Sequence, residues 1–413
     1  MNVFLVGGAV RDRLLGLPVH EKDWVVVGAT PDEMLNRGFR QVGNDFPVFL
    51  HPHTHEEYAL ARVERKTGHG YQGFAFDTSP NVTLEEDLMR RDLTVNAIAE
   101  DASGQIVDPY DGQSDLEKRI FRHVSPAFSE DPLRVLRVAR FTTRYAPQRF
   151  TIDPETMQLM SDIVAAGELP HLAAERIWSE TERAMATPQP SIYFQVLRAC
   201  GALAVLLPEV EALFGVPQPP KWHPEVDTGL HTLMVIDQAA QLSDDLTVRF
   251  AGLMHDLGKA LTPPEQWPSH RGHEATGAKL VDQVCDRIRA PKQFRKLAKD
   301  VAEYHTHCHK VFELKPSTLL KALNAMSAFR DPDHVRRFTL ACEADARGRT
   351  GLEQRPYPQA AFFCGAMDAA LNVKNADIAA QGHTGKAFGD ALQKARILAI
   401  RDYKATNAPQ TNT

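Results

Sequence analysis

The spacing of apolar residues changes type near residue 115, and this change constrains the fold more than any other feature of the chain. Upstream of it, short apolar runs of strand length alternate with glycines and turn residues. The runs lie at residues 3–6, 24–27, 46–50 and 57–61. Residues 31–37 have helical spacing, with Thr30 as the N-cap before Pro31. The first part of the chain is therefore predicted to be α/β, a small mixed sheet with flanking helices.

Downstream of residue 115 the pattern predicts helix after helix. Apolar residues recur at three- and four-residue steps, and histidines are frequent up to about residue 310. The Pro-rich stretch 215–224 predicts a domain boundary, and the residues from Asp402 onward are expected to fray. We expect an α/β domain over residues 1–114, an all-α body over 115–220, a second all-α domain over 221–375 and a helical tail over 376–413.

Composition restricts the cellular setting and the class of partner. The 413 residues carry a formal net charge of −6, which argues against a uniformly basic nucleic-acid binder but leaves room for a local basic groove. The five scattered cysteines predict reduced thiols. No apolar run approaches the roughly 18 residues of a membrane span, and the start of the chain is charged too early for a secretory signal. We therefore expect a cytoplasmic protein without a membrane partner.

A glycine turn and two acids near the start of the chain form the first group of candidate functional residues. Gly7 and Gly8 follow the first predicted strand and open a predicted helix, where backbone N–H groups and Arg11 favour an anion. Glu21 and Asp23 stand two positions apart at the start of the next strand, so their carboxylates would share one face. Standing alone, such a pair is more often a solvated strand end, but as hard oxygen donors the two acids suit Mg²⁺.

Arginines form the second part of this candidate site. Arg90, Arg91 and Asp92 are expected at a helix start. Farther along, residues 130–140 interleave arginines with apolar residues, and the segment 132–149 contains no acid to pair with them at helical spacing. We therefore expect a face of unpaired arginines, which suits the phosphates of a nucleoside triphosphate or of tRNA.

Histidines of the second helical domain form a separate candidate site. His255 and Asp256 lie in an apolar helix that is expected to end at Gly258, and both can reach one metal ion if the helix end opens onto a pocket. Imidazole with carboxylate suits Ni, Co, Mn or Fe. A lone histidine is usually structural, but the additional histidines argue for a metal site. They are His231, His273 and His305.

Taken together, these motifs resemble those of the class II tRNA nucleotidyltransferases. The resemblance rests on residues 7–12, the acid pair, residues 90–97 and residues 130–134, which occur in the family's order. With the His-Asp cluster, nearly the whole chain resembles the bacterial CCA-adding enzymes that carry an added HD phosphohydrolase domain. The resemblance implies template-independent addition and repair of the 3′-terminal CCA of tRNA from CTP and ATP, with release of pyrophosphate. In these terms residues 1–114 would be the catalytic head, 115–220 the nucleotide-selecting and tRNA-binding region, and 221–375 the HD domain.

The resemblance also implies roles for individual residues of the first site. Glu21 and Asp23 would hold the catalytic Mg²⁺, and a third carboxylate is expected from Glu57 or Glu64, which the sequence does not distinguish. Where the family usually has Asp-x-Asp, this chain has Glu21 as the first acid. The triphosphate would be held by Gly8, Arg11, Arg91, Arg137 and Arg140. Asp131 and Arg134 would bind the edge of the cytosine or adenine base.

For the HD cluster, the resemblance implies a bound transition metal, with Ni²⁺ as the expected ion. It implies hydrolysis of 2′,3′-cyclic phosphates, 2′-nucleotides and other phosphomonoesters. The implied ligands are His231, His255, Asp256, His273, His305 and Asp345. His307 and His309 are expected at the surface, and residues 222–224 are expected to be a structural turn. The implied partners are tRNA, CTP and ATP, bound by a monomer or weak homodimer.

Two other functions stay open on the sequence. A bacterial poly(A) polymerase would share the first set of motifs, although the HD segment, the sequence pI of 6.3 and the lack of a basic carboxy-terminal extension argue against it. A nucleotide-binding regulator, in which only the HD module turns over, is suggested by the substitution at Glu21.

Overall fold

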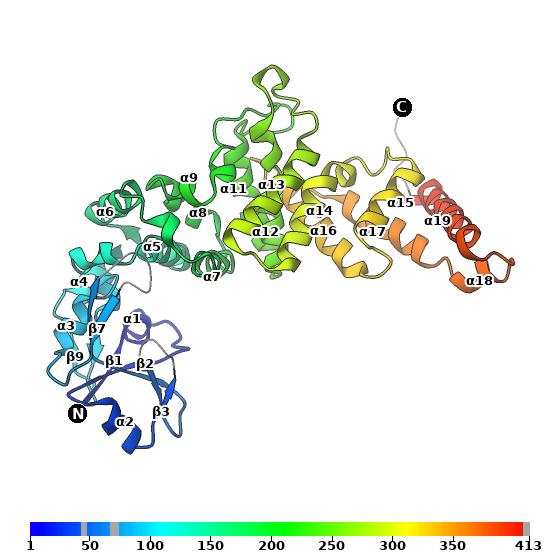
Figure 1. Cartoon of the computed structure of the whole chain (residues 1–413). Helices are drawn as coiled ribbons and strands as arrows, with labels where there is room; N and C mark the ends of the chain where they lie inside the picture. Colours follow the sequence, from blue (N-terminus) through cyan, green and yellow to red (C-terminus); the bar gives the residue numbers. More distant parts are fainter. Residues whose placement is uncertain (43–47, 67–73, 408–413) are drawn as a thin grey trace. The chain divides into compact units, whose positions relative to one another are not determined.

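The computed structural model describes residues 1–42, 48–66 and 74–407, with backbone alone at 64–66 and 74–76. The chain divides into two compact units, which are described separately. Unit 1 comprises Met1–Thr181 and Gln195–Leu206, and unit 2 comprises Glu182–Phe194 and Leu207–Thr413. The colours of Figure 1 follow the sequence through both.

Unit 1 begins with a seven-stranded mixed sheet in the order β3-β4-β5-β2-β1-β8-β9. Its strands are β1 (Asn2–Val6), β2 (Asp23–Val27), β3 (Arg40–Val42), β4 (Val48–Leu50), β5 (Glu57–Leu60), β8 (Ala99–Glu100) and β9 (Ile106–Val107). β2 and β5 are parallel, and the other neighbours are antiparallel. A separate antiparallel pair consists of β6 (Val63–Lys66) and β7 (Phe74–Asp77). The predicted small mixed sheet is therefore confirmed.

Both faces of this sheet are covered. Because side chains alternate along a strand, the neighbours Val25 and Val26 enter different apolar clusters. Val25 packs in a cluster with residues of α3 (Leu84–Met89), and Val26 in a cluster with Met34 of α2 (Pro31–Asn36). The predicted N-cap of α2 is confirmed, because the Thr30 hydroxyl accepts a hydrogen bond from the Glu33 backbone N–H.

The rest of unit 1 is mainly helical, as predicted. Its helices include α4 (Gly112–Lys118), α5 (Leu133–Arg144), α6 (Pro154–Ala165) and α9 (Ala202–Leu206), with a short parallel pair of strands, β10 (Ile120–Phe121) and β11 (Thr151–Ile152). Helices α7 (Ala174–Met185) and α8 (Ser191–Ala199) contribute to both units. Helix α5 is buried on most of its surface, because Leu133, Leu136 and Val138 lie in the core together with several of its polar residues.

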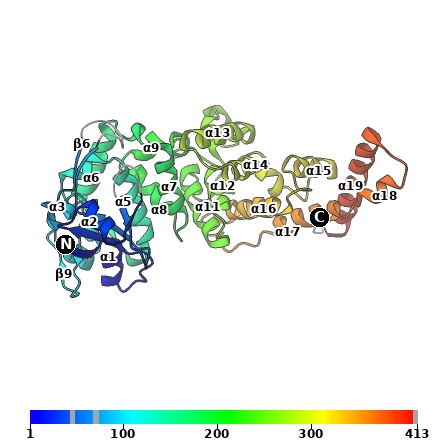
Figure 2. The same ribbon diagram turned by 60° about the horizontal axis from the view of Figure 1, so that its bottom comes forward.

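Unit 2 is a helical assembly. Its longer helices are α11 (Thr228–Leu242), α12 (Leu246–Met254), α13 (His273–Ile288), α14 (Lys292–His309), α15 (Pro316–Ala325), α16 (Pro332–Arg347), α17 (Pro358–Leu371) and α19 (Gly385–Asn407); α10 (Pro208–Glu211) and α18 (Asn375–Ala379) are short. Helices α12 and α16 pack on each other and on both α11 and α14, and α13 packs on α14. Figure 2 shows these helices side by side. Among the described residues, no helix has both the length and the apolarity that crossing a bilayer requires.

Two expectations about unit 2 are wrong, and one about the cysteines of the whole chain agrees with the structure. Helix α12 ends at Met254 rather than at Gly258, and a 3₁₀ turn (Leu257–Leu261) follows. The predicted fraying from Asp402 is wrong as far as Asn407, because Tyr403 packs on Phe362 with ring centroids 5.2 Å apart and continues α19. The five cysteines are free thiols, as expected.

Candidate active sites

The first site is formed where three strand ends meet. Because β1 and β2 are antiparallel, the glycine turn after Val6 lies beside Asp23, which is paired with Val6. Because β2 and β5 are parallel, Glu57 is paired with Asp23 from the other side. Registered residues of neighbouring strands project to the same face. The Gly7-Gly8 turn, Asp23 and Glu57 therefore lie at one end of the sheet, and Asp23 and Glu57 are both exposed.

The turn itself needs glycine. Gly7 has φ of 69°, a left-handed conformation that glycine adopts without strain. A Cβ at Gly7 would lie 2.9 Å from Nη1 of Arg91, and a Cβ at Gly8 would lie 3.3 Å from Nη2 of Arg11. Helix α1 (Gly8–Leu14) starts here, as predicted. Two guanidinium groups thus lie directly against the glycine turn, and each is also paired with a carboxylate, Arg11 with Asp12 and Arg91 with Asp87.

The electrostatics of Asp23 link the predicted acid pair to Arg91. Desolvation raises the pKa of Asp23, the Arg91 guanidinium opposes that rise, and the nearby Glu21 carboxylate adds to it. Glu21 lies just before β2 rather than on it, so the strand-face argument does not apply to Glu21, yet it is near enough to repel Asp23. Repulsion between two carboxylates is what a bound divalent cation relieves, so the oxygen donors fit Mg²⁺.

The arginines of α5 do not form an unpaired face. Their partners are acids far away in the sequence, with N–O distances of 2.7 Å for Arg137–Asp92, 2.5 Å for Arg140–Glu180 and 3.1 Å for Arg144–Asp12. The prediction failed because it considered only acids within one helical turn, whereas these pairs join residues 40 to 132 positions apart.

Arg90 and Arg91 are also placed differently from the prediction. They lie directly after the end of α3 rather than at the start of an α-helix, and the next element is a single 3₁₀ turn (Thr94–Asn96). Asp92 is buried and accepts hydrogen bonds from Arg137 and from the Asn96 amide. Burial alone would raise the pKa of Asp92, but Arg137, the Asn96 hydrogen bond and Arg134 together lower it. Asp92 is therefore a fixed negative charge that orients Arg137.

The predicted nucleotide-binding residues fall into two groups. Arg11, Arg134 and Arg140 are only 3–8% exposed. By contrast, Gly8, Arg91, Asp131 and Arg137 are partly exposed. The structure thus brings all seven into unit 1, but it gives only the second group access to solvent.

The buried group is held by protein partners. Arg11 donates to Asp12 and to the Asn96 side chain, and it lies over the Tyr145 ring. Arg134 donates to the carbonyl oxygens of Ala127 (2.7 Å) and Arg90 (2.5 Å). The partly exposed Asp131 accepts from Arg176 at 2.9 Å. The sequence placed Asn96 in a family motif without assigning it a role, and it did not indicate Tyr145 or Arg176. The Glu64 side chain lies outside the described residues.

The second site lies in unit 2 and brings together all the residues predicted for it. His231 comes from α11, His255 and Asp256 follow α12, His273 begins α13, His305 lies on α14 and Asp345 lies on α16. These six residues are 0–8% exposed. Gly258 allows the close approach, since a Cβ there would collide with the carbonyl oxygen of His273.

The ligand atoms form two adjoining triplets. Nε2 of His231 lies 3.1 Å from Oδ1 of Asp345, and Nε2 of His255 lies 3.9 Å from the same oxygen. In the other triplet, Oδ1 of Asp256 lies 3.5 Å from Nε2 of His273 and 3.6 Å from Nε2 of His305. Within each triplet the donor atoms lie within 4.8 Å of one another, close enough to share a metal ion.

The four histidines are oriented by their other ring nitrogen. Each Nδ1 faces a backbone carbonyl oxygen at 2.7–2.9 Å, so Nδ1 carries the proton and Nε2 offers a lone pair to the cluster. The carbonyls belong to Gly348, Gly252, His270 and Val301. Nε2 of His255 and Oδ1 of Asp256 are buried and make no hydrogen bond within the part of the chain that the structure describes, although Nε2 of His255 lies 3.0 Å from Oδ2 of Asp256. Buried polar atoms are normally satisfied, so this donor set fits a transition metal.

Several residues near the cluster were missed or misplaced by the sequence analysis. Nζ of Lys259 lies 2.6 Å from Oδ2 of Asp256. His309 is partly exposed, with 21% of its side chain accessible, but its Nε2 also lies 2.6 Å from Oδ2 of Asp345, so it belongs to the surroundings of the cluster. The signal for both was spacing, since Lys259 is three residues after Asp256 and His309 is four after His305, and such neighbours share a helical face. His307 is partly exposed.

The Pro-rich stretch packs onto this cluster. Glu225 places Oε1 3.1 Å from Nδ1 of both His223 and His231. Gln218 accepts from Nζ of Lys259 at 2.6 Å. Residues 222–224 are therefore more than a structural turn, because His223 belongs to the network that surrounds His231.

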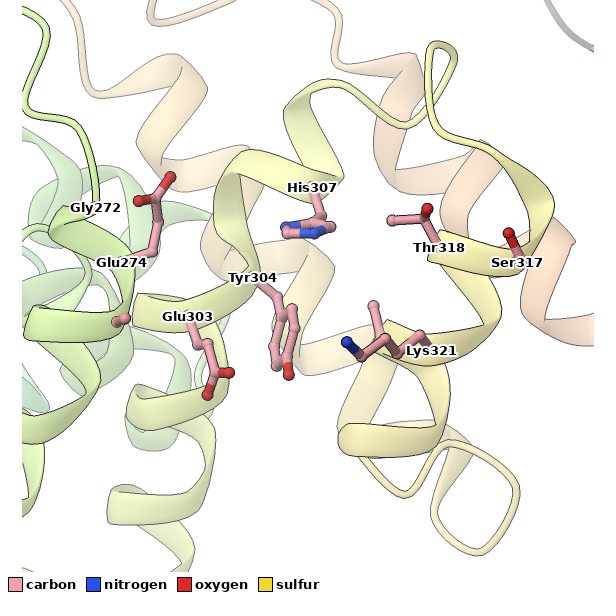
Figure 3. Close-up of a pocket in the computed structure, with 10 residues that line it drawn as sticks. Gly272, Glu274, Glu303, Tyr304, His307, Ser317, Thr318 and Lys321 are labelled. Atoms are coloured by element: carbon pink, nitrogen blue, oxygen red, sulfur yellow. The ribbon is translucent and has the colours of Figure 1, made fainter.

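A cavity of about 700 Å³ lies between α13, α14 and α15 (Figure 3). It is lined in part by Glu303 and His307 of α14, which lie two residues on either side of His305 and so on the opposite side of the helix. The metal-cluster residues do not line it, so it is separate from the second site.

Comparison with known proteins agrees with this arrangement. The poly A polymerase head domain matches residues 3–122, a probable RNA and SrmB-binding site of polymerase A matches residues 149–214, and the HD domain matches residues 228–330. Multifunctional CCA proteins of Hahella chejuensis and Pseudomonas fluorescens are 58% and 59% identical over 410 and 409 residues. Each alignment covers 99% of this chain, and 97% and 100% of the relative.

Solved structures share the fold at low sequence identity. A CCA-adding enzyme in apo form II superimposes with a TM-score of 0.66 at 18% identity, covering 99% of this chain and 89% of that chain. A Thermotoga maritima CCA-adding enzyme complexed with tRNA gives 0.63 at 17% identity, covering 98% and 91%. With a head domain and an HD domain on one polypeptide and near-complete alignment to these relatives, the chain belongs to the family of the multifunctional CCA proteins.

Proposed function

We propose that unit 1 adds the CCA nucleotides to the 3′ end of tRNA, using CTP and ATP and releasing pyrophosphate. The convergence of the glycine turn, Asp23 and Glu57 at one end of the sheet carries this proposal. It agrees with the names of the relatives and with solved CCA-adding enzymes in complex with CTP and with ATP.

In this proposal Asp23 and Glu21 hold Mg²⁺. Of the two candidates for a third carboxylate we choose Glu57, because it is paired with Asp23 on the neighbouring strand. When bound, Mg²⁺ would neutralise charge on the attacking 3′-oxygen and the departing pyrophosphate. Gly8 and Arg91 orient the triphosphate beside the acids, and Arg137 is held ready by Asp92. Arg11 and Arg140 act from buried positions, by fixing the turn and α5.

Base selection is assigned to Asp131 and Arg134. A carboxylate accepts from the exocyclic amino group that cytosine and adenine share, and a guanidinium donates to ring acceptors. Both groups are bonded to protein atoms, so a base edge would have to displace Arg176 from Asp131 and a carbonyl oxygen from Arg134. We propose the same domain limits as from the sequence: the head over 1–114, the selecting region over 115–220, the HD domain over 221–375 and the tail over 376–413.

We propose that the HD cluster hydrolyses phosphoesters, with 2′,3′-cyclic phosphates and 2′-nucleotides as substrates and Ni²⁺ as the preferred ion. When bound, the metal would polarise the phosphoester and an attacking water. Lys259 and Arg349 place positive charge beside the cluster, where a substrate phosphate would bind.

The decisive experiment incubates the whole protein with tRNA that lacks its terminus, Mg²⁺ and each labelled nucleoside triphosphate. The proposal expects three added nucleotides from CTP and ATP, and rejection of UTP and GTP. A long A tract would instead identify a poly(A) polymerase. No incorporation, with phosphohydrolase activity retained, would identify a regulator whose HD module alone turns over.

A further inference from the structure

His309 links the proposed metal cluster to a tyrosine on the next segment of unit 2. It lies one helical turn after His305 on α14. Its Nε2 is 2.6 Å from Oδ2 of Asp345, and its Nδ1 is 2.8 Å from the hydroxyl of Tyr357, which directly precedes α17. Three side chains from three segments thus form one continuous hydrogen-bonded chain.

The direction of this chain follows from the hydrogen-bonding capacity of its members. An ionised carboxylate only accepts, so Nε2 of His309 carries the proton that it donates to Asp345. In the neutral ring, Nδ1 must then accept, and the Tyr357 hydroxyl is the donor. Burial raises the pKa of Tyr357, which keeps its hydroxyl protonated.

This hydrogen-bonded series gives the two carboxylate oxygens of Asp345 different partners. Oδ2 is occupied by His309, whereas Oδ1 faces Nε2 of His231 at 3.1 Å and Nε2 of His255 at 3.9 Å. Arg349 also donates to Oδ1, at the longer distance of 3.3 Å, so without His309 the carboxylate would be held less firmly against the rotation about χ2 that exchanges its two oxygens. Asp345 is only 3% exposed, so water cannot easily replace His309.

We propose that His309, fixed by Tyr357, is a positioning residue that aims Oδ1 of Asp345 into the HD metal cluster and so sets its metal affinity. This inference rests on the proposed metal-dependent function of the HD cluster. Partners of this kind, outside the ligand set, typically change metal affinity by 10- to 100-fold.

The test measures Co²⁺ affinity of the full-length protein by chelator competition, together with the visible Co²⁺ absorption spectrum. We expect His309→Ala to weaken Co²⁺ binding about 10- to 100-fold and to alter the spectrum. His309→Gln keeps an N–H donor of similar reach and should restore most of the affinity. Tyr357→Phe removes only the anchor of His309 and should have a smaller effect in the same direction.

Phosphohydrolase kinetics with 2′,3′-cyclic AMP separate positioning from substrate binding. At saturating Co²⁺, His309→Ala should lower kcat more than it changes KM. His307→Ala is the matched control, because it lies on the same helix but lines the separate cavity, and it should leave Co²⁺ affinity unchanged. Nucleotide addition to tRNA should be the same in all variants, which checks that the chain is folded.

The outcomes distinguish the two levels of the argument. If the wild-type protein binds Co²⁺ and His309→Ala binds it equally well, the positioning role is refuted. Equal weakening by His309→Ala and His309→Gln would refute it as well, because the donor would not matter. If the wild-type protein itself binds no Co²⁺, the proposed HD function fails.

Discussion

The two candidate sites offer opposite kinds of environment to a metal ion. In unit 1 the donors are carboxylates at exposed strand ends, and the surrounding cations are guanidinium groups. In unit 2 the donors are imidazoles and carboxylates that are 0–8% exposed, with each ring oriented by a backbone carbonyl. Mg²⁺ retains waters and is commonly shared with substrate phosphates, whereas a buried nitrogen-rich set suits a resident transition metal. Under the proposed function, the first site would therefore be completed by its nucleotide, and the second by the protein alone.

The largest expected effect is a double dissociation between the sites. Asp23→Ala should lower nucleotide addition by at least about 100- to 1,000-fold, because a hard donor is lost, and should leave phosphohydrolase activity intact. His255→Ala should do the reverse. Labelled CTP incorporation into end-trimmed tRNA and phosphate release from 2′,3′-cyclic AMP measure the two activities on the same preparations. Loss of both activities in either variant would contradict the independence of the two sites.

Metal binding should stabilise only the buried site in the absence of nucleotide. Ni²⁺ at 100 times its dissociation constant should raise the free energy of unfolding of unit 2 by about 2.7 kcal/mol, by mass action. Chelation of the metal should remove this stabilisation. Differential scanning calorimetry measures it. In the His255→Ala variant most of the stabilisation by Ni²⁺ should be lost, whereas the Asp23→Ala variant should retain it. Mg²⁺ alone should produce no comparable shift, and an equal Mg²⁺ effect would contradict the contrast between a shared and a resident ion.

The Asp92–Arg137 pair predicts a specific pH dependence. The pKa of Asp92 is lowered in the folded protein from its ordinary value of 3.8, so its contribution to stability is complete above that value and is lost progressively as the pH falls below it toward the lowered pKa of the folded protein. Asp92→Asn should cost about 1–2 kcal/mol at neutral pH, a figure reduced because Arg137 is 35% exposed.

Urea unfolding of wild type and Asp92→Asn between pH 7 and pH 3 checks this prediction. The difference in free energy of unfolding between the two proteins should be constant above pH 5 and shrink below about pH 4. Asp390→Asn, at an exposed position on α19, is the control and should show no difference at any pH. A difference that grows with falling pH would have the wrong sign and would refute the role of Asp92.

The smallest effect is expected at the edge of unit 1. Arg144 pairs with Asp12 at 3.1 Å but is 46% exposed, so Arg144→Ala should cost no more than about 1 kcal/mol. High salt should reduce the difference further. Thermal unfolding at 0.05 M and 0.5 M NaCl measures both. A cost of several kcal/mol, independent of salt, would show that the pair acts as a buried one.

Local chemistry was predictable from the sequence. The change of apolar period placed the mixed sheet before the helices, and Thr30 capped α2 as expected. Five of the HD residues were predicted as one cluster from their types and number, whereas Asp345 was implied only by the family resemblance; the structure gathers all six. Apart from Asp345, the signal lies within a few residues or in residue type alone.

Tertiary structure decided the partners. Arg137 meets Asp92 across 45 residues, and Tyr357 meets His309 across 48. Sequence spacing reports only neighbours within a turn or along a strand, so it could identify arginines without local acids but not the distant acids that neutralise them. Which charges meet is set by how segments pack after the chain has folded, and that packing turned a predicted phosphate-binding face into a largely paired one.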